Sequence, residues 1–435
     1  MNAADRLPAA AADAAPHPVT ESSPAVQAGA DPSHYLGRHP ALAALRRWHS
    51  EFTAIRHALH ANPELGFEEH FTGELIARQL DRYGVDEVHR GIGRTGLVGV
   101  IRGRHTHSAR TIGLRADMDA LPMQEENEIA HRSRKAGCMH GCGHDGHVTM
   151  LLGAARYLAA HRDFDGTAHL IFQPGEEGMG GAKAMIDDGL FERFPCDSIY
   201  AMHNWPALAP GKLAVRPGPI MAAADRITIH IEGRGGHGAH PYQAIDPVLV
   251  AAHIITAAQS IVSRNVSPID SAVVSLCSVQ AGNPGAMSVI PREAKLVGTV
   301  RTFRVDTQNM IEARLRELVG SVAAAFGAKA ELQYERIYPA TINSTREALF
   351  GARVAAELVG DENLVRDLEP SMGAEDFSFM LHARPGAYFR IGQGGAENGA
   401  FLHNTRYDFN DQILPLGAAL FVRLTEQAMP IGSMA

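Results

Sequence analysis

The pattern of apolar and polar residues in the first half of the chain alternates between strand length and helix length. Three short apolar runs have the length of buried strands, and the stretches between them carry apolar residues at helical spacing. The predicted strands are 110–116, 167–173 and 198–203, and the helical stretches are 147–160 and 182–191. A further helix is predicted over 41–65, with the Asn-Pro pair near its end as a stop signal. This order predicts an α/β domain built on a largely parallel sheet.

A second pattern begins after a turn-rich segment that ends near residue 220. Strands with alternating polarity are followed by helical stretches and by more strands. The predicted strands are 225–235, 271–282, 295–304 and 328–338, and the predicted helices are 245–262 and 307–327. They predict a compact α+β unit over 219–336. Because the chain then returns to helix and strand alternation, we interpret this unit as an insertion between residues 41–218 and 337–430 of a larger domain.

Length and composition agree with two domains and exclude some classes of protein. The chain has 435 residues, 45% of them hydrophobic, which exceeds what one hydrophobic core usually organises. A formal net charge of -8 lacks the basic surplus of a nucleic-acid-binding protein. No run reaches the roughly 18 consecutive apolar residues that span a bilayer, so no membrane association is predicted.

The first 40 residues and the cysteine content bear on location. Residues 1–40 are rich in alanine, proline and polar residues and lack the features of a secretory signal. They predict a disordered leader, or equally an extension without consequence. Four cysteines in so long a chain make no disulfide framework, so a reducing compartment, the cytoplasm, is expected.

Acidic residues and histidines cluster where the three predicted strands end. The first strand leads into Asp117 and Asp119, the second into Glu176 and Glu177, and the third into His203. Open α/β sheets place their ligand sites at the carboxyl ends of their strands, so we expect these groups to converge.

The sequence GCGHDGH, ahead of an apolar helical stretch, adds further metal-binding groups. It contains Cys142, His144, Asp145 and His147. Together with the strand-end clusters these residues predict a metal site. Taken singly, each motif also has an ordinary explanation: a solvated turn, a surface histidine loop, or acidic residues that cap the next element.

The pair Glu176 and Glu177 indicates how such a site would work. Two ionised carboxylates side by side in a shielded cleft repel each other unless positive charge offsets them, and a divalent metal supplies that charge. Adjacent residues do not easily bind one ion. We therefore expect one glutamate to bind metal while the other handles a proton from activated water.

Seven motifs in order resemble those of the metal-dependent aminoacylase and carboxypeptidase superfamily. They are most similar to the branch of hippurate hydrolases, N-acyl-amino-acid amidohydrolases and plant auxin-conjugate hydrolases. The motifs are RADMDALP, HGCGHDGH, FQPGEEG, AMHNWP, GRGGHGAHP, GAEDF and LHNTRYDFND, and the resemblance runs from about residue 45 to about 425. It implies a mixed α/β metallohydrolase domain, with a largely parallel sheet and an inserted lid and dimerisation domain.

The resemblance also implies a site for two divalent metal ions. The implied ligands are Cys142, His144, Glu177, His203 and His403. Cys142 stands where carboxypeptidase relatives use a bridging aspartate, and Glu176 is the implied general base. Asp119 would orient a ligand, and Asp117, where many relatives outside this branch carry a histidine ligand, ranks below the five. A sulfur, three imidazoles and a carboxylate favour Zn, Mn, Co or Ni.

The inserted domain carries implied roles of its own. The resemblance implies a homodimer in which His237 reaches the partner's active site and stabilises the tetrahedral oxyanion, although its glycine-rich loop could equally be only flexible. Arg301 is the candidate for binding a substrate carboxylate, with a solvated strand-end arginine as the alternative. Ser288 stands where relatives usually have a substrate-contacting asparagine, which weakens any inferred substrate preference. His240 receives no role.

The sequence thus predicts a cytoplasmic metal-dependent amidohydrolase that cleaves a small N-acyl or N-aroyl amino acid into a carboxylic acid and a free amino acid. One alternative is a dipeptidase or carboxypeptidase with the same metals. Another is a non-catalytic metal- or ligand-binding protein on the same scaffold, although such a protein has no need of a proton shuttle at Glu176. A nucleotide-binding enzyme is disfavoured, because neither GGHG nor GQGG has the residues of a phosphate loop.

Overall fold

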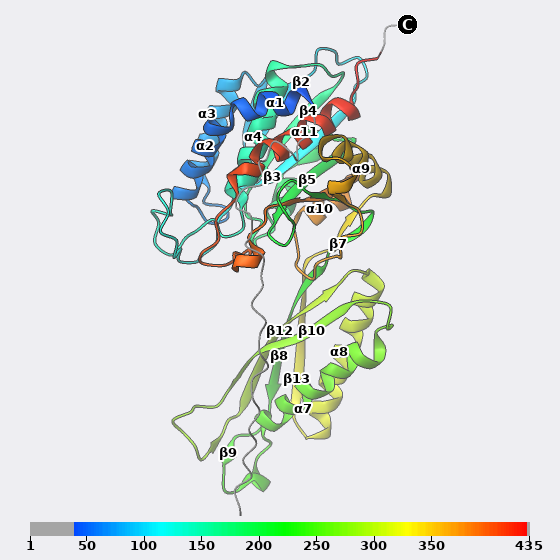
Figure 1. Cartoon of the computed structure of the whole chain (residues 1–435). Helices are drawn as coiled ribbons and strands as arrows, with labels where there is room; N and C mark the ends of the chain where they lie inside the picture. The colour runs from blue at the N-terminus through cyan, green and yellow to red at the C-terminus, as the bar shows by residue number, and fades with distance from the viewer. Residues whose placement is uncertain (1–38, 433–435) are drawn as a thin grey trace, which may run out of the picture. The chain divides into compact units, whose positions relative to one another are not determined.

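An eight-stranded, mostly parallel sheet organises the larger part of the chain (Figure 1). The computed structural model describes residues 39–432, so the predicted leader lies outside the described residues except for His39 and Pro40. The strand order is β1 (Glu87–Ile92), β2 (Gly96–Arg102), β4 (Thr167–Gln173), β3 (Thr111–Asp117), β5 (Ser198–Trp205), β16 (Gly386–Gly392), β6 (Leu213–Ala214) and β15 (Leu364–Val365). Parallel pairing joins β4, β3, β5 and β16, which confirms the predicted fold class.

Helices cover both faces of this sheet, because the central strands are apolar on both sides. Along β5, Tyr200 and Met202 belong to one buried cluster, whereas Ile199 and Ala201 belong to another. The first cluster is covered by α1 (Pro40–Arg47), α2 (His49–Ala61), α3 (His70–Tyr83), α4 (His144–Ala160), α9 (Thr345–Val359) and α11 (Leu414–Ala428). The second is covered by α5 (Gly181–Asp187), α6 (Leu190–Arg193) and α10 (Phe377–Ala383). Continuous apolar runs are typical of such doubly covered strands.

Three predicted helices differ from the structure at their ends. The helix expected over 41–65 is two helices, α1 and α2, interrupted at Trp48 and ending before Asn62. The helix expected over 182–191 is divided by Gly189, which has a φ of 83°. The helix expected from residue 147 begins at His144, because Gly143 adopts a left-handed conformation (φ 93°) that starts the helix three residues earlier. His144 and Asp145 therefore lie on the first turn of α4 and not ahead of it.

A separate four-stranded antiparallel sheet forms between residues 223 and 338. Its order is β10 (Ala272–Ala281), β12 (Glu293–Thr302), β8 (Ala223–Glu232) and β13 (Lys329–Tyr338). Helices α7 (Pro247–Ser260) and α8 (Val305–Ala325) pack on one face around a buried cluster of their own (Figure 1). At the root of this unit, β7 (Gly218–Met221) pairs with β14 (Thr341–Asn343). We call residues 223–338 the lid unit below.

Helix α7 and its continuation have the length and composition of a membrane span. Residues 247–265 meet both criteria by length and composition alone, 33% of this stretch is buried, and a single such helix is weak evidence of a membrane span. Val250, Ile254 and Ile261 are completely buried against the lid sheet.

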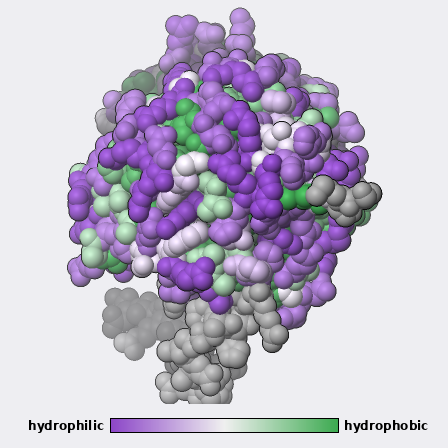
Figure 2. Space-filling model, turned by 90° about the horizontal axis from the view of Figure 1, so that it is seen from above, coloured by the Kyte–Doolittle hydropathy of each residue, from purple (hydrophilic) through white to green (hydrophobic). Residues whose placement is uncertain are grey.

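On the face of the molecule seen in Figure 2, hydrophilic residues predominate and apolar residues are scattered among them.

Candidate metal centre and active site

The predicted site residues meet at a cavity of about 410 Å³ near the carboxyl ends of β4 and β5. Four of the five predicted ligands line it, together with the predicted base, Glu176: these ligands are Cys142, Glu177, His203 and His403. The fifth, His144, is fully buried next to them on the first turn of α4. Segments far apart in the sequence therefore converge as the strand-end clusters predicted.

The ligand atoms of these residues fall into overlapping groups of the size that a metal ion requires. Within each group, all candidate ligand atoms lie within 4.8 Å of one another. Cys142 belongs to one group with His144 and His203 and to a second with Glu177 and His403. Since Cys142 is common to both groups, it would contribute to holding metal in either of them.

Two histidines are oriented as metal ligands usually are. The Nδ1 of His203 donates to the carbonyl of Asn204 (2.8 Å), which leaves Nε2 facing the Cys142 sulfur at 3.3 Å. The Nδ1 of His144 lies 3.2 Å from Asp119 Oδ1, and its buried Nε2 has no hydrogen-bond partner. A histidine that binds metal through one nitrogen typically donates the other to a carbonyl or carboxylate. Both residues fit this pattern.

Asp119 links two of the predicted ligands. One carboxylate oxygen faces His144, and the other accepts a hydrogen bond from the backbone N–H of Glu177 (2.9 Å). The Oε1 of Glu177 is buried without a hydrogen-bond partner and lies 3.2 Å from His403 Nε2. His403 itself has a φ of 61°, a strained left-handed conformation for a residue with a side chain.

Glu176 has different surroundings from its neighbour. It is buried, its Oε1 accepts the backbone N–H of Asp376 (3.3 Å), and its carboxylate lies close to those of Glu375 and Asp376. Burial, then the charges of Glu375 and Glu177, raise the pKa of Glu176 well above its ordinary value. A carboxylate with a raised pKa is suited to accept and return a proton near neutral pH.

The donor set fits a cation on electrostatic grounds. Burial, followed by the negative charges of Glu177 and Glu176, raises the pKa of the Cys142 thiol well above its ordinary value. A thiolate at this position therefore requires compensating positive charge. Although burial opposes it, the carboxylates of Asp117 and Asp119 raise the pKa of His144 to about 10, so this pocket attracts positive charge.

Arg115 centres a buried ion-pair cluster that the sequence motifs did not predict. Its guanidinium contacts Asp117 (2.7 Å), Glu375 (3.0 Å) and Asp376 (3.2 Å). Asp117 also lies 2.6 Å from His147 Nδ1. Asp117 and His147 are thus engaged with each other, although together with His144 they form a further group of metal-binding size. The residues of this cluster stand in the motifs RADMDALP and GAEDF, but the motifs alone do not show that a buried arginine pairs with carboxylates from both.

The three predicted residues of the lid unit are placed differently. Arg301 lines the site cavity and, among the described residues, has no hydrogen bond or ion pair. His237 lies on β9 (Gly236–His237), which pairs with β11 (Val289–Ile290) next to Ser288, and neither His237 nor Ser288 lines the cavity. The structure of one chain therefore does not bring these two into the site. The role of His237 in a partner's site stays a prediction.

A buried histidine beneath the site provides a test by pH. His60 lies 2.8 Å from Asp145 and 3.3 Å from Glu125, and against the effect of burial these carboxylates raise its pKa to about 9. The pKa of His60 is higher in the folded protein than in the unfolded one, near 6.5, so protonated His60 stabilises the folded state. This stabilisation is complete below pH 6.5 and is lost as pH rises through 9. At about 1.4 kcal/mol per pKa unit it is on the order of 3 kcal/mol.

Urea unfolding at pH 6 and pH 9.5 measures this effect. The free energy of unfolding should fall between the two pH values by on the order of 3 kcal/mol more in the wild type than in His60→Gln. Equal pH dependence in the two proteins would contradict the assignment.

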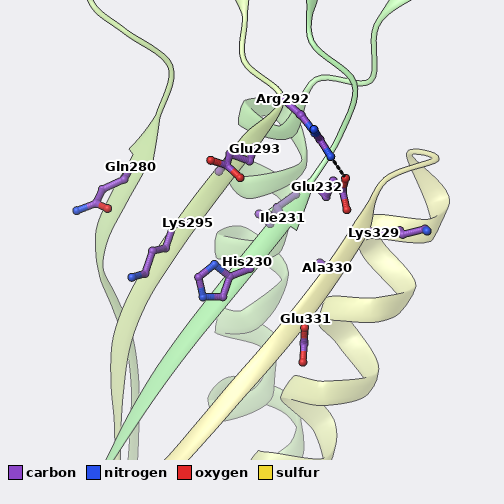
Figure 3. A pocket seen from close by; sticks show the side chains of 11 residues that line it. His230, Ile231, Glu232, Gln280, Arg292, Glu293, Lys295, Lys329, Ala330 and Glu331 are labelled. Atoms are coloured by element: carbon purple, nitrogen blue, oxygen red, sulfur yellow. Dashed lines mark hydrogen bonds and ion pairs between the residues drawn. The ribbon is translucent and has the colours of Figure 1, made fainter.

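A larger cavity, of about 920 Å³, lies on the open face of the lid sheet (Figure 3). Its side chains come from β8, β12, β13 and the end of β10, and Arg292 pairs there with Glu232 at 2.8 Å. Positive and negative residues are mixed, and none of the predicted site residues lines it. We assign the active site to the smaller cavity, because among the residues that the structure describes the predicted metal-binding and proton-transfer groups converge there.

Comparisons with known proteins show the family of the chain. A family model described as peptidase family M20/M25/M40 matches residues 113–427. Hippurate hydrolase of Campylobacter jejuni is 43% identical over 374 residues, 86% of this chain and 95% of that protein. Thermostable carboxypeptidase 2 of Saccharolobus solfataricus is 36% identical over 374 residues, 84% of this chain and 92% of that protein.

A solved structure extends the likeness to the fold. The crystal structure of the Bacillus subtilis YXEP protein, a dinuclear metal-binding peptidase of the M20 family, matches with a TM-score of 0.76 at 32% identity. The match covers 88% of this chain and 99% of that one. The resemblance drawn from the motifs is thereby confirmed, and the chain belongs to peptidase family M20/M25/M40.

Proposed function

We propose that this protein is a metal-dependent amidohydrolase that cleaves the amide bond of N-acyl and N-aroyl amino acids. The products are a carboxylic acid and a free amino acid. The observation that carries the proposal is the convergence of the His144 and Glu177 ligand atoms on the Cys142 sulfur, next to a second buried acid, Glu176, whose Oε1 accepts a hydrogen bond. The 43% identity to a hippurate hydrolase supports the same substrate class.

The residues that would hold two divalent ions are Cys142, His144, Glu177, His203 and His403. Divalent ions bound there supply Lewis acidity, which polarises an amide carbonyl and makes water easier to deprotonate. The mixture of sulfur, imidazole and carboxylate favours Zn, Mn, Co or Ni.

The remaining roles belong to side chains around the cavity. Glu176 takes the proton from the attacking water and passes it to the nitrogen of the leaving amine. Arg301, half-buried and without an ion pair among the described residues, suits a substrate carboxylate. Trp205, Met221 and Leu402 provide apolar wall for an acyl group.

We further propose a cytoplasmic homodimer. An exposed His237, outside the cavity of its own chain, is available to a second subunit, where it would stabilise the negative charge that develops on the carbonyl oxygen. Size-exclusion chromatography with light scattering tests the dimer. A monomer with full activity would remove this role from His237.

A substrate panel tests the proposed activity. Purified protein is chelated, reconstituted with Zn, Mn, Co or Ni singly, and assayed on benzoyl, indolyl and aliphatic acyl-amino acids and on free dipeptides. Chelation is expected to abolish turnover and at least one metal to restore it. Acyl-amino acids are expected to react faster than dipeptides, because the apolar walls of the cavity suit an uncharged acyl group better than the charged α-ammonium group of a dipeptide.

The panel also separates the alternatives. Faster hydrolysis of dipeptides would identify a dipeptidase or carboxypeptidase, the class to which one relative belongs. Metal-loaded protein that binds acyl-amino acids without releasing product would be a binding protein.

A further inference from the structure

Three residues on one rung of the lid sheet line the site cavity. Across the antiparallel strands, Arg301 of β12 pairs with Ala224 of β8, and Ala224 pairs with Tyr338 of β13. Directly opposed residues of a sheet project from the same face. All three line the cavity, so this row of paired residues lies next to the predicted catalytic residues, where the lid unit joins the larger domain.

A break in strand register puts Tyr338 on this rung. Along β13, residues 329, 331, 333 and 335 pair with every second residue of β8, and the next partner of Ala224 would be Ile337. The register shifts between Arg336 and Tyr338, so Tyr338 takes that place. Bulges of this kind are common next to active sites, where they redirect a side chain.

The hydroxyl of Tyr338 holds the turn that carries the predicted base. It donates to the backbone carbonyl of Glu176 (2.7 Å) and accepts the N–H of Gly180 (3.2 Å). Burial, with the charges of Asp376 and Glu176 nearby, raises the pKa of Tyr338, so the hydroxyl keeps its proton.

Other hydrogen bonds of this turn come from the larger domain: the Gly181 N–H donates to the Gly175 carbonyl (3.0 Å), and Asp119 accepts the Glu177 N–H (2.9 Å). Gly175, Gly178 and Gly180 all have positive φ, and glycine gives the turn more conformational freedom than any other residue would. The Tyr338 hydroxyl thus adds a contact from the lid unit that joins Glu176 to Gly180 within this glycine-rich turn.

We propose that Tyr338 is a positioning residue. It connects Arg301, through Ala224 and the strand pairing of the lid sheet, to the position of Glu176. A substrate carboxylate bound at Arg301 would restrict the motion of the three paired residues. Through its hydrogen bond, the Tyr338 hydroxyl would in turn restrict the motion of the Glu176 turn. The connection to Arg301 rests on the proposed function, whereas the hold on the turn does not.

Tyr338→Phe tests the proposal, because it removes one hydroxyl and keeps the ring. The matched control is Tyr334→Phe on the same strand, whose hydroxyl bonds Asp225 (2.5 Å) inside the lid unit, away from Glu176. The first measurement is amide hydrogen exchange of residues 174–181 in the full-length protein. Exchange should rise about five- to tenfold in Tyr338→Phe and stay unchanged in Tyr334→Phe.

The second measurement is steady-state kinetics on N-benzoylglycine and on its amide, which lacks the carboxylate. In Tyr338→Phe we expect kcat on the acid to fall about five- to tenfold, with KM and bound metal unchanged, and kcat on the amide to fall less than about twofold. Equal losses on both substrates, or loss of metal, would overturn the connection to Arg301. Unchanged exchange would overturn the hold on the turn. If the wild type hydrolysed neither compound, the proposed function would fail, and the exchange result alone would decide the role of Tyr338.

Discussion

Replacing Glu176 with glutamine is expected to reduce kcat by about 10²- to 10⁴-fold while both metal ions stay bound. Glutamine keeps the shape of the side chain and can still accept the Asp376 N–H, but it does not take a proton. The carboxylate of Glu176 lies within 4.8 Å of the ligand atoms of His144 and Glu177. Its Oε1 accepts a hydrogen bond from the Asp376 N–H, however, whereas Oε1 of Glu177 has no hydrogen-bond partner, so the loss should fall on proton transfer and leave metal binding intact.

The neighbouring residue provides the matched control. Glu177→Gln removes a predicted ligand one position away and should lose metal as well as turnover. Metal content by elemental analysis and kcat are measured on both variants and on the wild type. A Glu176→Gln enzyme with wild-type kcat, or one that has lost its metal, would reverse the roles assigned to the two glutamates.

The catalytic sheet could be predicted where its strands are buried on both faces. β3, β4 and β5 were recognised because each is a continuous apolar run, and β4 matches its predicted bounds, 167–173. The remaining strands of the large sheet were not predicted. The two-residue strands β6 and β15 carry too few residues for any periodicity, and their pairing depends on distant partners.

The site was predictable for a different reason. Strand-end placement brings Glu177 and His203 to the same cavity, so residue type and position were enough to predict it. The Arg115 cluster was not predictable, because its contacts with Glu375 and Asp376 join positions 260 residues apart along the chain. Tyr338 was missed because an alternating strand gives no sign of the register shift that redirects its side chain.

Replacing Cys142 with alanine is expected to abolish activity and to weaken metal binding by more than about a hundredfold. The loss of a residue that only hydrogen-bonds to a metal ligand already lowers metal affinity about 10- to 100-fold. Cys142 is itself a predicted ligand and is common to both ligand groups. Cys138→Ala is the matched control, because Cys138 is another buried cysteine four residues earlier that belongs to none of the ligand groups among the described residues. That variant should keep its metal.

Cys142→Asp separates the loss of a ligand from the loss of a thiolate. An aspartate can bridge two ions but is a harder ligand, so this variant should regain metal and shift its preference toward Mn over Zn. Competition with a chromophoric chelator measures affinity for each ion, and kcat is measured with each ion in turn. If Cys142→Ala bound two ions as tightly as the wild type, the bridging position would belong to another residue, and the nearest candidate is Asp117, which already forms a group of metal-binding size with His144 and His147.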